Sequence, residues 1–254
     1  MTRFKYLTFL MPENGLTHTL GNFENALKAA RNNVLTMASI AQQNLEYAIR
    51  GLLTRNPELC NEAIAEDDEV NAYERVIDRE GFEILMRFNP VAGDLREVLA
   101  GMKVANNLER VSDQAESIAR RSRKVLKSAE VPEIQQIEAL YEMAISLLKD
   151  AIRTFSEGDM ELGISLFERD QELDKAHRKL IKELTKAIER EPSAVKTYLH
   201  LIFIVRCLER VGDHAVNIAE DAIFAEKAAD VRHLRLEEAA EKAGVAPPSS
   251  TTES

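Results

Sequence analysis

Pairs of acidic residues recur at a spacing of four in segments where helices are expected. The pairs are Glu109 with Asp113, Asp170 with Asp174, and Glu209 with Asp213. On a helix, residues i and i+4 are neighbours with Cβ atoms about 5–6 Å apart, so both carboxylates of a pair can reach one metal ion. Oxygen ligands of this kind favour hard or borderline cations such as Mg, Mn and Fe over copper.

The placement of these pairs is more informative than their spacing. With 43 acidic residues in 254, about seven pairs at this spacing arise by chance. However, Asp67 and Asn71 hold the same place in the first half of the chain as Asp170 and Asp174 in the second. We therefore expect one metal site in each half. The candidate ligands are Asp67, Asn71, Glu109 and Asp113 in the first half, and Asp170, Asp174, Glu209 and Asp213 in the second.

Two alternatives remain open for these residues. Asp67 and Asp170 occupy seam positions of their helices, where an unpaired buried charge would be costly, but they could lie at the edge of the seam and reach solvent. His177 and His214 could add nitrogen ligands and shift the second site toward iron or zinc. A lone histidine near a bundle is more often a packing residue.

The chain is an internal duplication. The stretch from Leu108 to Ala115 matches the stretch from Leu208 to Ala215 at a shift of 100 residues. Nearer the N-terminus, Ala48-Ile49-Arg50 recurs at a shift of 103 as Ala151-Ile152-Arg153. A shorter connecting loop in the second half accounts for the difference of three residues. Each half is therefore a homologous unit of about 100 residues.

Three helices are expected in each half. Apolar and small residues of the third helix step alternately by four and three, from Val104 through Leu108 to Val125, which is the heptad seam of an antiparallel bundle. Prolines and glycines mark the ends of the helices. The first two helices are expected over about 23–54 and 57–88 in one half, and over about 132–157 and 160–191 in the other.

These patterns predict an all-α protein made of two tandem homologous three-helix bundles, with an up-down topology like that of spectrin repeats. The predicted bundles span residues 23–128 and 132–227. An N-terminal extension, 1–22, precedes them. Residues 228–254 are expected to hold the end of a helix and a disordered tail, because the last residues are small and polar.

Composition narrows the classes of function. The chain has 33 Lys and Arg against 43 Asp and Glu, a net charge of -10, which argues against a nucleic-acid binder. Its two cysteines, Cys60 and Cys207, are far apart, which excludes a disulfide scaffold and fits a reducing cytoplasm. No apolar stretch approaches the ~20 residues that span a bilayer. We expect a cytoplasmic protein, peripheral to the membrane at most.

At its acidic motifs the sequence resembles the PhoU family, the regulators that accompany bacterial phosphate ABC transporters. The resemblance covers about residues 23–226 and rests on Glu109-Arg110-Val111-Ser112-Asp113-Gln114-Ala115, the stretch from Glu209 to Glu220, and Pro90–Arg96. It implies metal clusters on E/D-x-x-x-D motifs, here of Fe, Mn, Mg or Zn, and repression of the phosphate-starvation response. It also implies two partners, the ATPase subunit of the transporter and a sensor histidine kinase; we further expect a homodimer.

The first half departs from the family pattern. Ser112 and Gln114 replace the usual glycine and histidine, and Asn71 replaces the second acid of the middle-helix motif. The first site is therefore one carboxylate poorer than the second. The segment before Phe23 is longer than the usual start of the family, and no function is predicted for it.

No catalytic constellation is recognisable in the sequence, so we predict a binding protein that is not an enzyme. A ferritin-like di-metal oxidase needs two Glu-x-x-His motifs, and only Asp174-x-x-His177 comes close. A metal-free helical adaptor with solvated acids stays open as the alternative. The run from Arg120 to Lys124 could contact anionic lipid or the transporter, or simply form a favourable cationic last turn of a helix.

Overall fold

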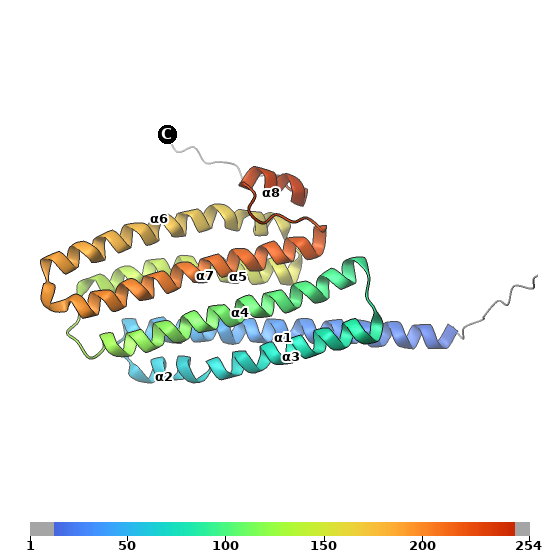
Figure 1. Cartoon of the computed structure of the whole chain (residues 1–254), viewed down its shortest axis with the longest axis horizontal. Coiled ribbons are helices and arrows are strands. Elements are labelled where there is room, and N and C mark those ends of the chain that lie inside the picture. The colour runs from blue at the N-terminus through green and yellow to red at the C-terminus, as the bar shows by residue number, and fades with distance from the viewer. Residues whose placement is uncertain (1–12, 247–254) are drawn as a thin grey trace, which may run out of the picture.

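The computed structural model describes residues 13–246, with side chains from residue 21 onward, and all regular structure in this part is helical (Figure 1). The predicted all-α class is therefore confirmed. The helices are α1 (Glu13–Leu53), α2 (Pro57–Ala65), α3 (Asp67–Phe88), α4 (Ala92–Val125), α5 (Gln135–Glu157), α6 (Met160–Arg190), α7 (Val195–Lys227) and α8 (Leu236–Ala243), with 3-10 turns at Pro132–Ile134 and Pro192–Ala194.

Local capping explains where several helices begin and end. The side chain of Asn56 accepts hydrogen bonds from the backbone N–H groups of Glu58 and Leu59 at the start of α2, and Asp159 caps α6 in the same way. Such side chains satisfy N–H groups that have no partner inside the helix. Gly158 ends α5 in the left-handed conformation, with φ of 69°.

The middle helix of the first half differs from the prediction of one continuous helix. It is divided at Glu66 into α2 and α3, whereas its counterpart α6 is unbroken. The N–H groups of Glu69 and Val70 both bond to the Glu66 carbonyl, so the helical ladder restarts there. Asp67 becomes the first residue of α3, where the positive end of the helix dipole favours a carboxylate.

Both ends of the described chain hold more helix than predicted. α1 begins at Glu13, ten residues before the predicted start at Phe23. After α7, the chain turns back and forms α8, which packs on α6 through a small separate hydrophobic cluster that includes Ile164, Val231 and Ala240. Residues 1–12 and the last part of the predicted disordered tail, 247–254, lie outside the described residues.

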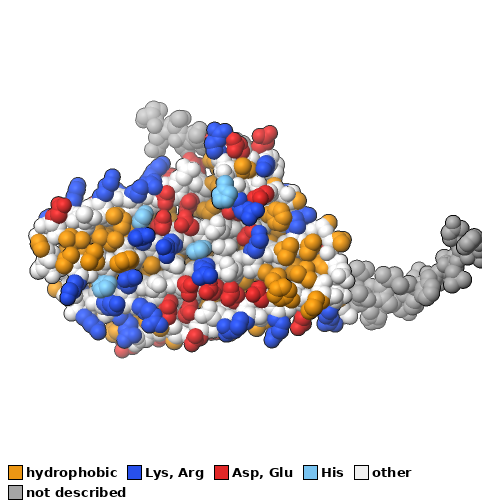
Figure 2. Space-filling view, viewed as in Figure 1, with side chains coloured by type: hydrophobic (Ala, Val, Ile, Leu, Met, Phe, Trp, Pro, Cys, Tyr) orange, Lys and Arg blue, Asp and Glu red, His pale blue; other side chains and the backbone are white. Residues whose placement is uncertain are grey.

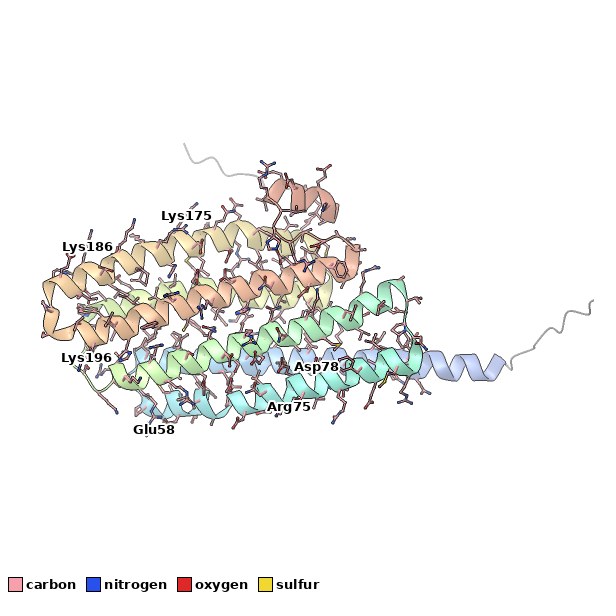
Figure 3. All side chains as sticks on the ribbon, in the orientation of Figure 1. Glu58, Arg75, Asp78, Lys175, Lys186 and Lys196 are labelled. Atoms are coloured by element: carbon pink, nitrogen blue, oxygen red, sulfur yellow. The ribbon has the colours of Figure 1, made fainter. Side chains whose placement is uncertain are left out.

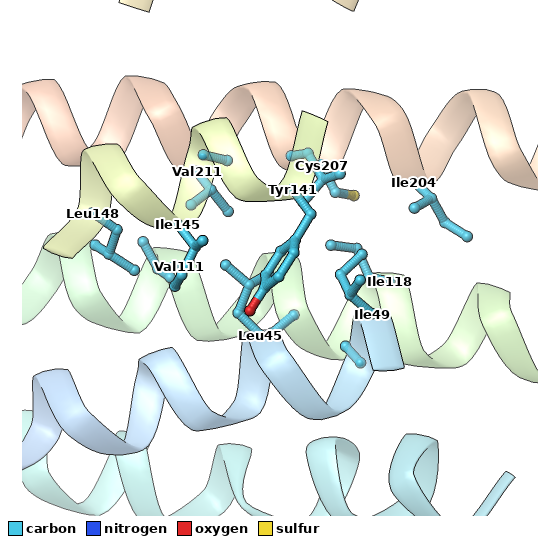
Figure 4. Packing of buried hydrophobic residues seen from close by; sticks show 14 of the residues in the cluster. Leu45, Ile49, Val111, Ile118, Tyr141, Ile145, Leu148, Ile204, Cys207 and Val211 are labelled. Carbon is cyan, nitrogen blue, oxygen red and sulfur yellow. The ribbon is translucent and has the colours of Figure 1, made fainter. Parts of the chain in front are cut away.

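The helices form two bundles, α1–α4 and α5–α7, as predicted, but the bundles share one hydrophobic core. The most extensive helix pairing in the described chain joins α4 to α7, the last helices of the two halves. Figure 4 shows Leu45 of α1, Val111 of α4, Tyr141 of α5 and Val211 of α7 in one buried cluster. Among residues 13–246, no helix is both long and apolar enough to cross a membrane.

A shared core predicts that the two bundles unfold together. Leu108 and Leu208 are fully buried at equivalent places in the two halves. Replacing either by Ala is expected to cost about 3 kcal/mol, because the lost contacts leave a cavity. Urea denaturation should give one transition in both variants, shifted to lower urea, while Leu199→Ala at an exposed position should have a much smaller effect. Two separate transitions would contradict a shared core.

Candidate metal centre

The second bundle brings acidic side chains of two helices together. Asp170, Asp174 and His177 follow one another on α6 at spacings of four and three, and Glu209 and Asp213 lie one turn apart on α7. These spacings place the residues of each helix on one face. Ligand atoms of Asp174, His177 and Glu209 all lie within 4.8 Å of one another, and no other group of described residues meets this criterion for a metal site.

His177 has an unsatisfied atom at this cluster. Its Nε2 is buried and has no hydrogen-bond partner, which is costly for a polar atom out of contact with water. Two carboxylates and an imidazole form a donor set suited to zinc, iron or manganese. The residues of the second bundle therefore fit a metal ion. Asp174 also pairs with Arg178 at 3.0 Å, on the exposed side of α6.

Burial, and after it the repulsion of neighbouring acids, raises the pKa values of the carboxylates. Burial raises the pKa of Asp170 to about 7, with further contributions from the neighbouring charges of Asp213 and Asp174. Desolvation beside α6, together with Glu209 and Asp174, raises the pKa of Asp213 to about 6. Burial also lowers the pKa of His177, which keeps its imidazole neutral and able to coordinate. A cation would relieve the repulsion among these acids.

Gly212 allows this close approach of α6 and α7. A Cβ atom at this position would lie 2.3 Å from Cδ2 of Leu173 and 3.0 Å from Oδ1 of Asp170. The first of these separations is shorter than any real contact of a Cβ atom. The absence of a side chain at position 212 therefore lets the carboxylate of Asp170 lie against α7.

In the first bundle the residue equivalent to Gly212 is Ser112, and its side chain forms hydrogen bonds within the acidic site. The Ser112 hydroxyl donates to Oδ1 of Asp67 at 2.8 Å and accepts a hydrogen bond from Nδ2 of Asn44 at 3.1 Å. Asn71 donates to the other oxygen of Asp67 at 2.9 Å. Asn44 and Ser112 are fully buried. Both oxygens of the Asp67 carboxylate are therefore satisfied by neutral donors of the protein, without an ion.

The remaining predicted ligands of the first bundle, Glu109 and Asp113, both lie close to Arg110. Glu109 and Asp113 lie 3.3 Å and 3.4 Å from nitrogens of Arg110. Oε2 of Glu109 is buried without a hydrogen bond, and burial raises the pKa of Glu109. The structure does not bring these two residues and Asp67 into a group as close as the one in the second bundle. The first-half residues thus fit a metal ion less well.

The two candidate histidine ligands, His177 and His214, lie in different surroundings. His177 lies in the acidic cluster, and its repeat equivalent is Glu74, which accepts a hydrogen bond from Asn106 at 3.3 Å. His214 instead faces the other bundle, where its Nδ1 lies 3.2 Å from Oδ1 of Asn107. The sequence signal for His177 was its seam position, three residues after Asp174. His214 directly follows Asp213 and is five residues after Glu209, so the same spacing already favours His177 over His214 as a ligand.

The raised pKa of Asp170 predicts a pH dependence of stability. The folded protein holds this proton more tightly than the unfolded chain between the ordinary pKa of 3.8 and about 7. The free energy of unfolding of metal-free protein should therefore fall as the pH rises through this range. Asp170→Asn should flatten this slope and be more stable than wild type at pH 8 in urea denaturation. The exposed Glu172→Gln should keep the wild-type slope; an unchanged slope in Asp170→Asn would refute the prediction.

Comparison with known proteins agrees with the duplication. The model of the PhoU domain matches residues 34–122 and again residues 137–222. A phosphate-specific transport system accessory protein PhoU homolog of Pseudomonas aeruginosa is 31% identical over 229 residues, covering 89% of this chain and 95% of that protein. The corresponding PhoU protein of Serratia marcescens is 30% identical over 217 residues, covering 85% of this chain and 89% of that protein.

Solved structures are similar over the same part of the chain. The crystal structure of PhoU from Pseudomonas aeruginosa has a TM-score of 0.79 at 29% identity, covering 81% of this chain and 99% of that one. The phosphate transport system regulatory protein PhoU from Streptococcus pneumoniae has a TM-score of 0.76 at 23% identity, covering 82% and 99%, and supports the fold. With its two matched domains and its relatives along most of its length, the chain belongs to the PhoU family.

Proposed function

We propose that this protein is a cytoplasmic negative regulator of phosphate uptake and of the phosphate-starvation response. It would act by binding the ATPase subunit of the phosphate ABC transporter and a sensor histidine kinase, as a homodimer. The observation that carries the proposal is the match of the PhoU domain to both halves of the chain. The names of the relatives, accessory proteins of the phosphate-specific transport system, point the same way.

Such a regulator can work by binding alone. A change of partner affinity by a few kcal/mol between two states is enough to shift a signalling equilibrium. The shared core of the two bundles suits this role, because α4 and α7 pack against each other and join the two bundles in one core. A partner bound to the first bundle would thus alter the second through these helices.

A bound metal ion is a second, separately testable part of the proposal. Asp174, His177 and Glu209 would hold the ion, with Asp170 and Asp213 as further carboxylates for the multinuclear cluster that the resemblance to the PhoU family implies. Of Fe, Mn, Mg and Zn, the imidazole favours Fe and Zn over Mg. A bound cation would supply positive charge between α6 and α7 and so neutralise the crowded acids. These residues would thereby brace the two helices.

Elemental analysis of protein purified without chelator tests the metal. His177→Gln, Glu209→Gln and Asp213→Ala should each lower the content of bound Fe, Mn or Zn, because each removes a ligand or a neighbouring carboxylate. Glu109→Gln, the equivalent of Glu209→Gln in the first bundle, is the matched control and should retain more metal. Metal-free wild-type protein, or equal loss in all the variants, would count against the site.

The regulatory role is tested in cells. Deletion of the gene should raise alkaline phosphatase expression in phosphate-rich medium, because the sensor kinase would no longer be held off. Restoring the wild-type gene should return expression to its low level. Low expression after deletion, together with failure of the purified protein to bind either partner, would exclude the proposed role.

A metal-free adaptor is the second candidate, and the first bundle favours it. There the hydroxyl of Ser112 and the amide of Asn71 satisfy Asp67 with no ion. If metal is absent from the wild-type protein but deletion still raises alkaline phosphatase, the adaptor is the better description. The regulatory proposal therefore stands or falls independently of the metal.

A further inference from the structure

A polar groove of about 400 Å³ lies between α4 and α7, where the two bundles meet. Its lining includes Ser117 and Arg121 of α4, and Phe203, Arg206 and Arg210 of α7. Figure 2 shows the face over α4 and α7, which carries Lys and Arg side chains beside hydrophobic ones, with groups of Asp and Glu across its middle. Three arginines from both bundles therefore border one hollow on an otherwise acidic protein.

These three arginines have no ionic partner among the described residues. Thirteen ion pairs form in this part of the chain, and none includes Arg121, Arg206 or Arg210. The two carboxylates that line the groove are paired elsewhere: Asp113 with Arg110 and Glu116 with Arg120. The positive charge of the groove is therefore left without a neutralising group at ion-pair distance.

The three arginines line the same groove from two helices. Arg206 and Arg210 are one turn apart on α7, so they lie on the same face. Together with Arg121 they line the same groove, whose wall also includes Cys207. Like charges at this spacing on a helix repel one another, and a bound anion would offset this repulsion.

The guanidinium group of Arg121 on α4 stacks on the ring of Phe203 on α7. The guanidinium carbon of Arg121 lies 4.0 Å from the centre of the Phe203 ring. Stacking on an aromatic face uses the flat side of the guanidinium and leaves the N–H groups at its edge free to donate. The hydroxyl of Ser117 is a further possible donor on the same wall. The groove thus presents donors with no acceptor at ion-pair distance, beside the carboxylates of Asp113 and Glu116, which pair with other arginines.

We propose that this groove binds a phosphate-bearing anion, either inorganic phosphate or a small phosphate ester, between Arg121 of the first bundle and Arg206 and Arg210 of the second. Guanidinium groups bind phosphate oxygens in a bidentate manner, and a doubly charged anion suits three arginines better than a carboxylate does. A volume of about 400 Å³ falls within the range of small-molecule sites and admits an ester as well as phosphate itself. The inference rests on the arginine geometry and does not depend on the proposed regulatory function.

Isothermal titration calorimetry of the full chain tests the site. Potassium phosphate and adenosine monophosphate, each at ionic strength matched with potassium chloride, should bind saturably with one site per chain. Arg121→Gln and Arg206→Gln should each weaken binding at least tenfold. Arg75→Gln, an arginine on α3 labelled in Figure 3, is the matched control and should bind like wild type. Circular dichroism verifies that each variant remains folded.

The outcomes separate the sources of the anion. Tighter binding of the ester by tenfold or more supports an organic phosphate, and equal binding supports the phosphate group alone. Arg206 and Arg210 are also close to Glu209 in the sequence of α7, and arginines that served only to compensate this acid would give no saturable binding of the anion. No saturable binding, equal weakening by Arg75→Gln, or binding only to anionic lipid vesicles would overturn the proposal. None of these results bears on alkaline phosphatase expression, which tests the regulatory function separately.

Discussion

The contact between α4 and α7 is the constraint on which the rest of the structure depends. Each helix packs its heptad seam inside its own bundle, and both also pack against each other, so they are buried on more than one side. One continuous core results, with residues of both halves in contact. Because these two helices also carry Glu109, Ser112, Glu209 and Gly212, the same packing that stabilises the fold positions both acidic sites.

One pair of equivalent positions shows how the two halves have diverged. At position 212 the lack of a side chain lets α6 and α7 approach until Asp170 meets its neighbours. At position 112 a hydroxyl occupies this space and becomes a donor to Asp67. A buried carboxylate needs either donors or a cation. The first bundle provides donors, and the second leaves crowded acids and an unpartnered histidine nitrogen beside them.

The charges of α7 are arranged in neighbouring strips. Glu209 and Asp213 lie beside α6, where burial and mutual repulsion raise their pKa values. Arg206 and Arg210 border the groove toward α4. An acidic helix face and a basic one on the same element can accept a cation and an anion within a short distance, and both proposed ligands would then brace α7 against a neighbouring helix.

The sequence alone determined the helical class, the duplication and the pairing of equivalent acids, because helix periodicity and a repeated motif are local properties of the chain. It also indicated that the first site is the poorer one, from Asn71 and Ser112. The tertiary structure decided what depends on contacts between distant segments. It joined the bundles in one core, added His177 rather than His214 to the acidic cluster, and placed Ser112 between Asn44 and Asp67. Helix spacing says which residues share a face, but only the packing of the helices against one another says what each face meets.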